Sequence, residues 1–348
     1  MKEPSAPDIT VAVDAMGGDR APEVPVEGAV LAARRYGIPS ILVGDEEAVR
    51  QQLERLRADR LPVSVRHAGE VVGMQESPLS AARSKPQSSI RVCFDCLIKG
   101  EARAVFSAGN TGATLASALI SSKRLDGIAR PAVAATLPCM EGDVVFIDAG
   151  ASTSCRPGHL AQFALMGTVF AREIMGIQSP RVGLLSNGTE ESKGTETLRE
   201  AREIIKTIEG IEYVGFIEGG EIMQGGLDVV VTDGFTGNLV LKTIEGVGEF
   251  IVDSLADIFT GGALNRLGLA LLRDRIRNFR TRIDYASYGG APLVGIRHTC
   301  IIGHGRSSPE AVVNAERIAV KLETEGYLQK LADELDRTAS TSLREVDS

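Results

Sequence analysis

A short, mostly apolar run at Ile9–Val13, with the sequence ITVAV, is followed at once by the glycine-rich turn DAMGGD at Asp14–Asp19. Apolar runs this short are typical of strands buried on both faces of a parallel sheet. The same combination recurs along the chain, and segments with helical spacing lie between the runs. Two of these segments, Pro157–Met175 and Glu196–Ile208, have the length of crossover helices. The pattern predicts an α/β fold, doubly wound, with a mainly parallel sheet.

The other predicted strands share this apolar character and lie at Ile41–Val43, Val63–Val65, Ala104–Phe106, Val144–Ile147, Val182–Leu185, Tyr213–Ile217, Val229–Val231 and Cys300–Ile302. A chain of 348 residues suits one large α/β unit or two smaller ones. No repeat, low-complexity stretch or Pro/Ser-rich linker divides it. We therefore expect a single α/β domain over 1–337, in which 253–285 is a protruding, amphipathic and basic helical segment. Residues 338–348 form a polar tail.

Charge and cysteine content narrow the class of protein. Lys and Arg total 38 against 46 Asp and Glu, which gives a net charge of −8 with His neutral. Nucleic acid demands clustered positive charge, so a general nucleic-acid binder is not expected. Five cysteines at irregular spacing make no disulfide framework, and no apolar segment is long enough to span a bilayer. The N-terminus has no signal-peptide pattern, so we expect a cytoplasmic protein.

Polar, glycine-rich turns follow six of the predicted strands. Ligands of open parallel sheets bind beyond the carboxyl ends of the strands, so we expect these turns to converge on one site. Glycine lets the backbone approach a ligand closely, and the first N–H groups of a helix favour an anion. One such turn is usually only a connection, but six with the same polarity indicate an anion site. The turns are Asp14–Asp19, Ser107–Gly112, Asp148–Ala151, Ser186–Gly194, Thr232–Asn238 and Gly303–Ser308.

Several familiar chemistries lack their motifs here. The sequence contains no G-x-x-x-x-G-K-[ST] of a P-loop NTPase, no strand-linked G-x-G-x-x-G of a nicotinamide enzyme and no G-x-S-x-G nucleophile elbow. Cys93 and Cys96 form a C-x-x-C, but a structural zinc site needs four ligands and no second pair has suitable spacing. We expect these two cysteines to be small buried residues on one helix, and we expect no metal and no cofactor.

Two side chains within the turns are candidates for chemistry. Lys193 lies in NGTEESKG just before a predicted helix, where its ammonium can reach an anion held by backbone donors. The alternative is a solvated lysine beside Glu190 and Glu191. His304 lies in the turn GHGRSS, where it can donate to an anionic oxygen or exchange a proton near neutral pH, although a lone His is more often structural.

The stretch Asp253–Tyr285 breaks the alternation of strands and helices. It has helical character and combines an apolar stripe with clustered arginines. This combination is typical of a membrane-surface helix, but an acidic protein partner or a dimer contact would suit the arginines too, and many charge runs are only solvated. The residues predicted to form this surface are Arg266, Leu267, Leu271, Arg273, Arg277 and Arg280.

These motifs together resemble the bacterial phosphate acyltransferase family (PlsX type). The shared blocks run in order from VAVDAMGGD at Val11 to GHGRSS ending at Ser308, and include SAGNTGA, RPAVAATLP, GTEESKG, DVVVTDGFTGNLVLKTIEG and APLVGI. The resemblance implies an enzyme that makes acyl phosphate from acyl-acyl carrier protein and inorganic phosphate in phospholipid biosynthesis. It also implies a fold similar to the isocitrate/isopropylmalate dehydrogenase type, which phosphotransacetylases share, with 1–337 as the catalytic domain.

The same resemblance implies partners and a location. An acidic acyl carrier protein would dock on the arginines, and the chain would form a homodimer. It would contact the membrane peripherally, together with the downstream membrane acyltransferase, and would bind no nucleic acid. The expected location is therefore cytoplasmic and peripherally membrane-associated.

On this hypothesis phosphate attacks the thioester directly, because no activated nucleophile is visible. The candidate catalytic residues are Lys193 for phosphate, and Asn238 and His304 for the carbonyl or the departing thiol. The candidate substrate-binding residues, whose aspartates are expected to hold loop geometry, are Asn110, Thr111, Gly112, Gly194, Asp14, Gly17, Asp148 and Asp233. Ser152 departs from the family, which tends to have Asn there.

Two other functions remain open. One is a phosphotransacetylase-like enzyme that uses an acyl-coenzyme A thioester. The other is a non-catalytic, membrane-peripheral scaffold for lipid enzymes. A decarboxylating dehydrogenase of the same fold would need an acidic metal-binding cluster and a nicotinamide, for which the sequence shows no motif.

Overall fold

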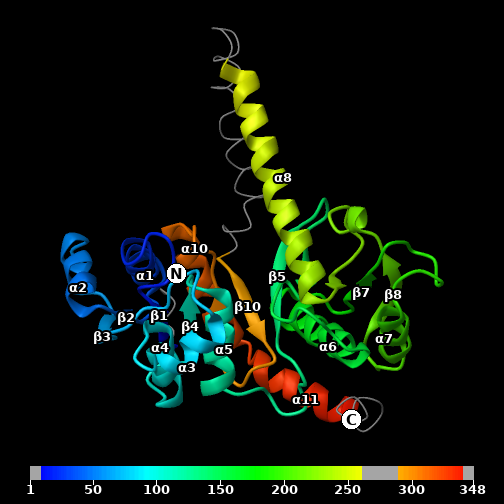
Figure 1. Ribbon diagram of the computed structural model, residues 1–348, viewed down its shortest axis with the longest axis horizontal. Coiled ribbons are helices and arrows are strands. Elements are labelled where there is room, and N and C mark those ends of the chain that lie inside the picture. The colour runs from blue at the N-terminus through cyan, green and yellow to red at the C-terminus, as the bar shows by residue number, and fades with distance from the viewer. Residues whose placement is uncertain (1–8, 261–288, 340–348) are drawn as a thin grey trace, which may run out of the picture.

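A computed structural model describes residues 9–260 and 289–339 of the chain. Its centre is an 11-stranded sheet in the order β3-β2-β1-β4-β11-β10-β5-β6-β9-β7-β8. Helices cover the sheet, and helix α8 projects away from it (Figure 1). The strands are β1 (Val11–Asp14), β2 (Ser40–Gly44), β3 (Val63–His67), β4 (Ala104–Ser107), β5 (Ala132–Pro138), β6 (Asp143–Ile147), β7 (Arg181–Leu185), β8 (Glu212–Ile217), β9 (Val229–Val231), β10 (Ala291–Val294) and β11 (Thr299–Ile302).

Helices lie on both faces of this sheet. Alternate residues of β1 show this, since Val11 and Val13 join a core cluster formed with α1, α6 and α10, whereas Ala12 joins one formed with α4, α5 and α8. The predicted α/β, doubly wound, mainly parallel fold is therefore confirmed. The helices are α1 (Glu23–Tyr36), α2 (Glu46–Arg55), α3 (Pro78–Ser84), α4 (Ser89–Ile98), α5 (Thr111–Ser121), α6 (Pro157–Ile174), α7 (Glu196–Lys206), α8 (Gly234–Thr260), α10 (Pro309–Thr324), α11 (Tyr327–Ala339) and the 3-10 turn η1 (Gly219–Glu221).

Two antiparallel strands, β10 and β5, divide the sheet into two blocks. They pair antiparallel with each other and with their neighbours β11 and β6, so the parallel strands of the two blocks run in opposite directions. Ile302 ends β11 opposite Ala291 of β10, and continuing the β10–β5 register places Ala291 opposite Ala135. On the other side of β5, Ile147 ends β6 opposite Ala134, the residue next to Ala135. The carboxyl ends of both blocks thus meet at one level, about 14 Å apart across three strand spacings.

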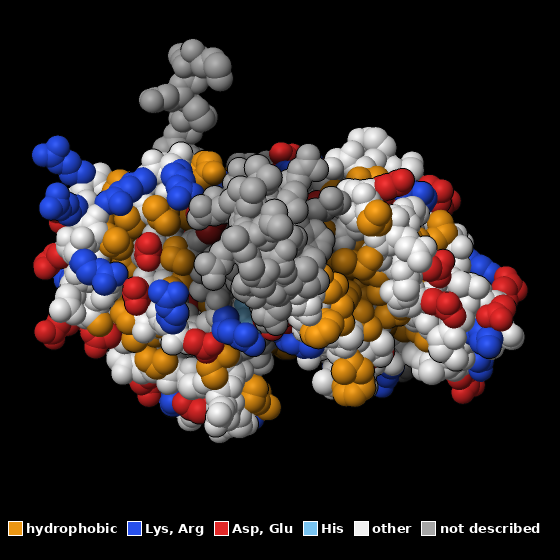
Figure 2. Space-filling view, turned by 90° about the horizontal axis from the view of Figure 1, so that it is seen from above, with side chains coloured by type: hydrophobic (Ala, Val, Ile, Leu, Met, Phe, Trp, Pro, Cys, Tyr) orange, Lys and Arg blue, Asp and Glu red, His pale blue; other side chains and the backbone are white. Residues whose placement is uncertain are grey.

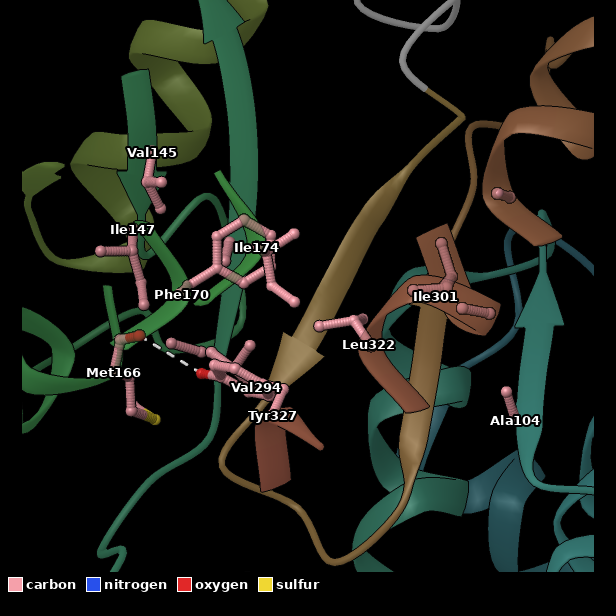
Figure 3. Packing of buried hydrophobic residues seen from close by; sticks show 14 of the residues in the cluster. Ala104, Val145, Ile147, Met166, Phe170, Ile174, Val294, Ile301, Leu322 and Tyr327 are labelled. Atoms are coloured by element: carbon pink, nitrogen blue, oxygen red, sulfur yellow. Dashed lines mark hydrogen bonds between the residues drawn. The ribbon is translucent and has the colours of Figure 1, made fainter. Parts of the chain in front are cut away.

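Tyr327 of α11 packs against α6 in the core. Its side chain is buried, its hydroxyl donates to the Met166 carbonyl oxygen at 3.3 Å, and its ring meets Phe170 edge-on with centroids 5.8 Å apart. Figure 3 shows this ring beside Val294 of β10, with Leu322 of α10 nearby. Helices α6, α10 and α11 therefore pack into one core under the strands that separate the blocks.

A carboxyl group is also buried in this core. Glu316 of α10 has no exposed surface, and Ser40 Oγ donates to its Oε2 at 2.8 Å. Its Oε1 has no hydrogen-bond partner within the ranges that the structure describes. Burial raises the pKa of Glu316 to about 8, because the charged form loses its hydration and the hydrogen bond from Ser40 offsets only part of that loss. Glu316 is therefore protonated at neutral pH.

The predicted basic segment lies mostly outside the described residues. Helix α8 reaches Thr260, so the first residues of 253–285 are helical as expected. The residues predicted to face a partner or membrane lie within 261–288 and are outside the description: Arg266, Leu267, Leu271, Arg273, Arg277 and Arg280. Most of the tail, 340–348, is outside it too. Of the helices that the structure describes, none combines the length and apolar character needed to cross a membrane.

Candidate active site

A first cluster of loops lies at the carboxyl ends of β1, β4 and β11. Asp14, at the end of β1, is only 3% exposed; its Oδ2 accepts from Ser107 Oγ at 2.7 Å, and its Oδ1 accepts from the Met16 N–H at 3.2 Å. Burial raises the pKa of Asp14, and its hydrogen bonds oppose that rise. Gly17 passes so close that an added Cβ would lie 2.8 Å from the Gly109 nitrogen. Asp14 and Gly17 thus hold two loops together.

Asn110 begins α5 and holds a neighbouring loop against it. Its Oδ1 accepts the N–H of Ala113 at 3.0 Å, which is the contact of an N-cap. Its Nδ2 donates to carbonyl oxygens of the loop 73–76 at 3.0 to 3.4 Å. Thr111 and Gly112 follow in the first turn of α5, where backbone N–H groups favour an anion. Asn110 therefore shapes this helix start through contacts to the chain itself.

His304 follows β11 in a tight turn. The Ser307 N–H donates to the His304 carbonyl oxygen at 2.8 Å, and the Arg306 N–H donates to Nδ1 of His304 at 3.1 Å. Nδ1 is therefore an acceptor, and the neutral ring carries its proton on Nε2. Burial lowers the pKa of His304, and the nearby ammonium of Lys242 lowers it further. At neutral pH, His304 is a neutral side chain that can donate a hydrogen bond from Nε2.

These three loops meet directly. The Asp19 N–H donates to the carbonyl oxygen of Gly305 at 2.8 Å. A cavity of about 10 Å³, enough for one water molecule, lies between the loops. Its lining comes from all three turns and from α1 and α10: Gly17, Gly18, Arg20, Val24, Pro25, Ala108, Gly305, Ser307 and Val312. The expected convergence of turns therefore holds for β1, β4 and β11.

A second cluster lies at the carboxyl ends of β6 and β9. Asp148 is fully buried, and its carboxylate accepts four backbone N–H groups at 2.8 to 3.0 Å, from Val133, Gly150, Ala151 and Ser152. Burial raises the pKa of Asp148, and these four hydrogen bonds oppose the rise. The N–H groups of this turn point to the carboxylate, so Asp148 sets the shape of the loop.

Asp233 has the same kind of role at the start of α8. Its Oδ1 accepts the N–H groups of Phe235 and Thr236, both at 3.0 Å. Asn238 is exposed one turn later, and a Cβ added to Gly150 would lie 3.4 Å from the Asn238 Cβ. The start of α8 therefore packs on the Asp148 loop and presents Asn238 beside it.

Lys193 and Gly194 lie on the loop after β7, the strand next to β9. Lys193 is exposed, and its stem passes Gly188 so closely that an added Cβ there would lie 2.8 Å from Lys193 Cγ. Within the described ranges, the Lys193 N–H donates to the carbonyl oxygen of Glu190 at 2.9 Å, so this contact and the approach to Gly188 both lie within its own loop. The hollow expected to join Lys193 with Asn110 and Asn238 stays a prediction.

Helix α8 links the two clusters. Arg306 Nη1 lies 3.5 Å from Glu249 Oε1, so an ion pair between two exposed side chains joins the His304 turn to this helix. Lys242 and Glu245 lie near enough to act on the charge of His304. Sequence reasoning named neither of these α8 residues as candidates. The available signal was the motif GNLVLKTIE, in which a lysine and a glutamate follow the asparagine at helical spacing.

The cysteine pair lies on helix α4, which packs on β1, the strand that ends at Asp14. Cys93 and Cys96 are free and buried on α4, as the sequence predicts. Burial raises the pKa of both thiols, which keeps them in the unreactive protonated form. Within 9–260 and 289–339, no group of three or more His, Cys, Asp or Glu is placed to hold a metal ion.

The arrangement is that of the phosphotransacetylase type of α/β fold. The structure matches a phosphotransacetylase from Streptococcus pyogenes with a TM-score of 0.62 at 19% identity, covering 91% of this chain and 94% of that one. It matches the EutD phosphotransacetylase from Staphylococcus aureus with a TM-score of 0.60 at 17% identity, covering 90% and 93%. At these identities the likeness concerns the fold alone.

Sequence comparison defines the family. The family model described as fatty acid synthesis protein matches residues 9–330. The chain is 46% identical over 338 residues to a phosphate acyltransferase of Geobacter sulfurreducens, covering 97% of both chains. It is 50% identical over 327 residues to a phosphate acyltransferase of Syntrophotalea carbinolica, covering 94% of this chain and 93% of the relative. The chain therefore belongs to the fatty acid synthesis protein family and is an acyltransferase, as the resemblance predicts.

Proposed function

We propose that the chain makes acyl phosphate from acyl-acyl carrier protein and inorganic phosphate, as a step of phospholipid biosynthesis. Family membership supports acyl transfer to phosphate, because its relatives are named phosphate acyltransferase. One structural observation carries the site: a neutral His304, with its proton on Nε2, lies near Lys242 of α8, the same helix that presents Asn238. Uncharged donors of this kind suit a developing oxyanion, which gains negative charge only during the reaction.

The chemistry is a direct displacement. An oxygen of HPO₄²⁻ attacks the thioester carbonyl carbon, a C–O bond forms, and the carbonyl becomes a tetrahedral oxyanion. The oxyanion then collapses, the C–S bond breaks, and the proton of the phosphate passes to the departing thiolate. Hydrogen phosphate is already nucleophilic, so this reaction needs correct positioning and oxyanion stabilisation more than a strong base.

Each candidate residue has a place in this proposal. Lys193 binds phosphate together with backbone N–H groups at the starts of α5 and α7. Asn238 and His304 interact with the carbonyl oxygen or with the leaving thiol. The backbone donors assigned to phosphate are Asn110, Thr111, Gly112 and Gly194. The remaining residues, Asp14, Gly17, Asp148 and Asp233, act by holding the loops, which is what their hydrogen bonds and close approaches support. Residues 1–337 form one catalytic domain in this proposal, and no cofactor takes part.

The test is thiol release by the purified full-length protein. We expect release from an acyl-acyl carrier protein that depends on added inorganic phosphate and yields acyl phosphate. Equal or faster release from acyl-coenzyme A would favour the phosphotransacetylase-like alternative. The absence of phosphate-dependent release from either thioester would contradict the enzyme and favour the scaffold.

Substituting Lys193 by alanine tests its role. Lys193→Ala is expected to keep the fold, because this side chain is exposed. It should reduce kcat/KM for acyl-phosphate formation by at least about tenfold, equal to about 1.4 kcal/mol of transition-state stabilisation. Lys206→Ala, an exposed lysine of the following helix α7, is the matched control and should keep its activity. Near-normal turnover of Lys193→Ala would remove Lys193 from the mechanism.

A homodimer is part of the proposal, and α8 offers a surface for it. Four apolar side chains on this helix are more than half exposed: Phe235 (64%), Leu239 (61%), Val247 (51%) and Phe250 (71%). Their spacing of four, eight and three residues places them along one side of the helix. Figure 2 shows the molecule from above, the end toward which α8 points, with hydrophobic side chains exposed among charged ones on this face. A second copy would cover such a surface.

Phe250→Glu tests this surface. The change places a charge where the dimer would bury an apolar side chain, so we expect the mass in light scattering to fall from that of a dimer to that of a monomer. Val214→Glu, on the exposed side of β8, is the control and should leave the mass unchanged. A Phe250→Glu protein that stays dimeric would show that α8 is not the interface.

The remaining proposals concern other partners. The acidic acyl carrier protein would dock on the arginines of 253–285, and the same segment would contact the membrane peripherally near the downstream membrane acyltransferase. The location is then cytoplasmic and peripherally membrane-associated. An acidic chain of net charge −8 offers little attraction for nucleic acid.

A further inference from the structure

A polar stripe runs along α8 between the two loop clusters. Asn238, Lys242, Glu245 and Glu249 follow one another at intervals of four, three and four residues. With 3.6 residues per turn, this spacing places all four on one side of the helix. The stripe begins beside the Asp148 loop, where Asn238 packs near Gly150.

The far end of the stripe faces the His304 turn. Glu249 Oε1 lies 3.5 Å from Nη1 of Arg306, two residues beyond His304. The two residues in the middle of the stripe act on the charge of the His304 ring: Lys242 lowers its pKa and Glu245 raises it. Lys242 therefore follows Asn238 by about one turn on the same side of α8, near enough to the His304 ring for its ammonium to lower the pKa of that ring.

Glu245 holds Lys242 in this position. Lys242 Nζ lies 2.7 Å from Glu245 Oε2, while the Lys242 side chain keeps 46% of its surface exposed. The other oxygen, Glu245 Oε1, is buried and has no hydrogen-bond partner within the described part of the chain. An ion pair between residues three apart on a helix surface contributes little, so the ammonium is free to turn to a stronger acceptor. A phosphate dianion carries twice the charge of the carboxylate.

We infer that Lys242 is a phosphate-binding residue of this site, holding the attacking dianion between Asn238 and His304. This inference rests on the proposed function, to which it adds a specific ammonium group. Lys242 on phosphate leaves Nε2 of His304 free for the carbonyl oxygen or the leaving thiol. The Lys242 ammonium also adds to the effect of burial on His304, because a second full positive charge beside it is unfavourable. Lys193, with its contacts in its own loop, would then act from the β7 side.

The test compares Lys242→Met with Lys242→Arg. Methionine keeps the length of the stem and removes the charge, so we expect the KM for inorganic phosphate to rise at least about tenfold, with a smaller change in the KM for the acyl donor. Arginine should restore much of the phosphate affinity. The control is Lys321→Met, an exposed lysine at the end of α10, which should match the wild type.

A second readout is independent of turnover. The chain has only 4 His residues, so the ring of His304 can be assigned by NMR and titrated with inorganic phosphate. We expect phosphate to shift the His304 signals of the wild type, with Lys242→Met requiring at least about ten times more phosphate, and the pKa of His304 to rise in that variant. The same phosphate response in both proteins, with a KM unchanged within about twofold, would overturn the inference. If the wild type binds phosphate at His304 but releases no thiol, the proposed function fails and the Lys242 site stands.

Discussion

Gly237→Ala is expected to disrupt the site more severely than any removal of a candidate catalytic side chain. A Cβ on Gly237 would overlap the carbonyl oxygen of Asp148 and lie 3.0 Å from a methyl carbon of Thr232. The obstacle is backbone, held in place by the four N–H groups on the Asp148 carboxylate. The backbone of Asp148 cannot move aside without disturbing those hydrogen bonds. We expect a loss of about 3 kcal/mol or more in the free energy of unfolding.

The measurement is denaturant unfolding followed by circular dichroism, together with acyl-phosphate formation. The control is Gly219→Ala, where an added Cβ has no heavy atom within 4 Å, and both stability and activity should stay near those of the wild type. A Gly237→Ala protein with an unchanged unfolding midpoint would show that α8 is free to move away from the Asp148 loop.

The second large effect is a change in how stability depends on pH. Glu316 has a pKa of about 8 in the folded protein against 4.5 as an ordinary side chain, so between these values the folded chain binds a proton that the unfolded chain has lost. The contribution of this group to the free energy of unfolding is therefore largest below pH 4.5, and it decreases as the pH rises toward 8. Glu316→Gln keeps the shape of the side chain and cannot ionise, so its stability does not fall for this reason as the pH rises.

We expect Glu316→Gln and the wild type to have similar stability near pH 4.5, the ordinary value for this side chain. At pH 8 the variant should be more stable by an amount on the order of 3 kcal/mol. Urea unfolding across this range measures the difference. Glu325→Gln, an exposed residue just after α10, should follow the wild type throughout. A constant difference between Glu316→Gln and the wild type at every pH would contradict the assignment of a buried, neutral carboxyl.

Much of the fold could be predicted because the buried strands have a simple pattern. Runs such as Val229–Val231 and Val144–Ile147 were recognised as strands from their apolar residues alone, and their ends agree with the structure within a residue. The pattern did not reveal β5 and β10. Three of the seven residues of β5 are alanine, which has low strand propensity, and β10 has four residues, one of them Pro292. These two strands reverse the direction of the sheet, so the opposed blocks could not be predicted.

The candidate site was predictable where it depends on local turns. Glycine next to Asp or Asn marked the loops correctly, and the hydrogen bonds of Asp14, Asp148 and Asp233 agree with a role in holding them. The direction of the N–H groups could not be read from the turns: those around Asp148 are taken up by its own carboxylate. Lys242 was not predicted, because the residues that lie near it come from distant parts of the sequence. The Glu249–Arg306 ion pair and the effect of Lys242 on the pKa of His304 bring this part of α8 near the His304 turn, which lies about 60 residues further along the chain.

The sheet order has a consequence for synthesis on the ribosome. Strand β4 ends at Ser107 and pairs with β1 on one side, but its neighbour on the other side is β11, which begins only at Thr299. Helix α1 likewise packs on α10, from the same late part of the chain. While the nascent polypeptide emerges, the edge of β4 stays without its partner until nearly the whole chain has been translated. Strands β6 to β9 come from one continuous stretch and can associate earlier. The amino-terminal half is thus made first and completed last, and its open edge is where a nascent or truncated chain is most exposed to aggregation.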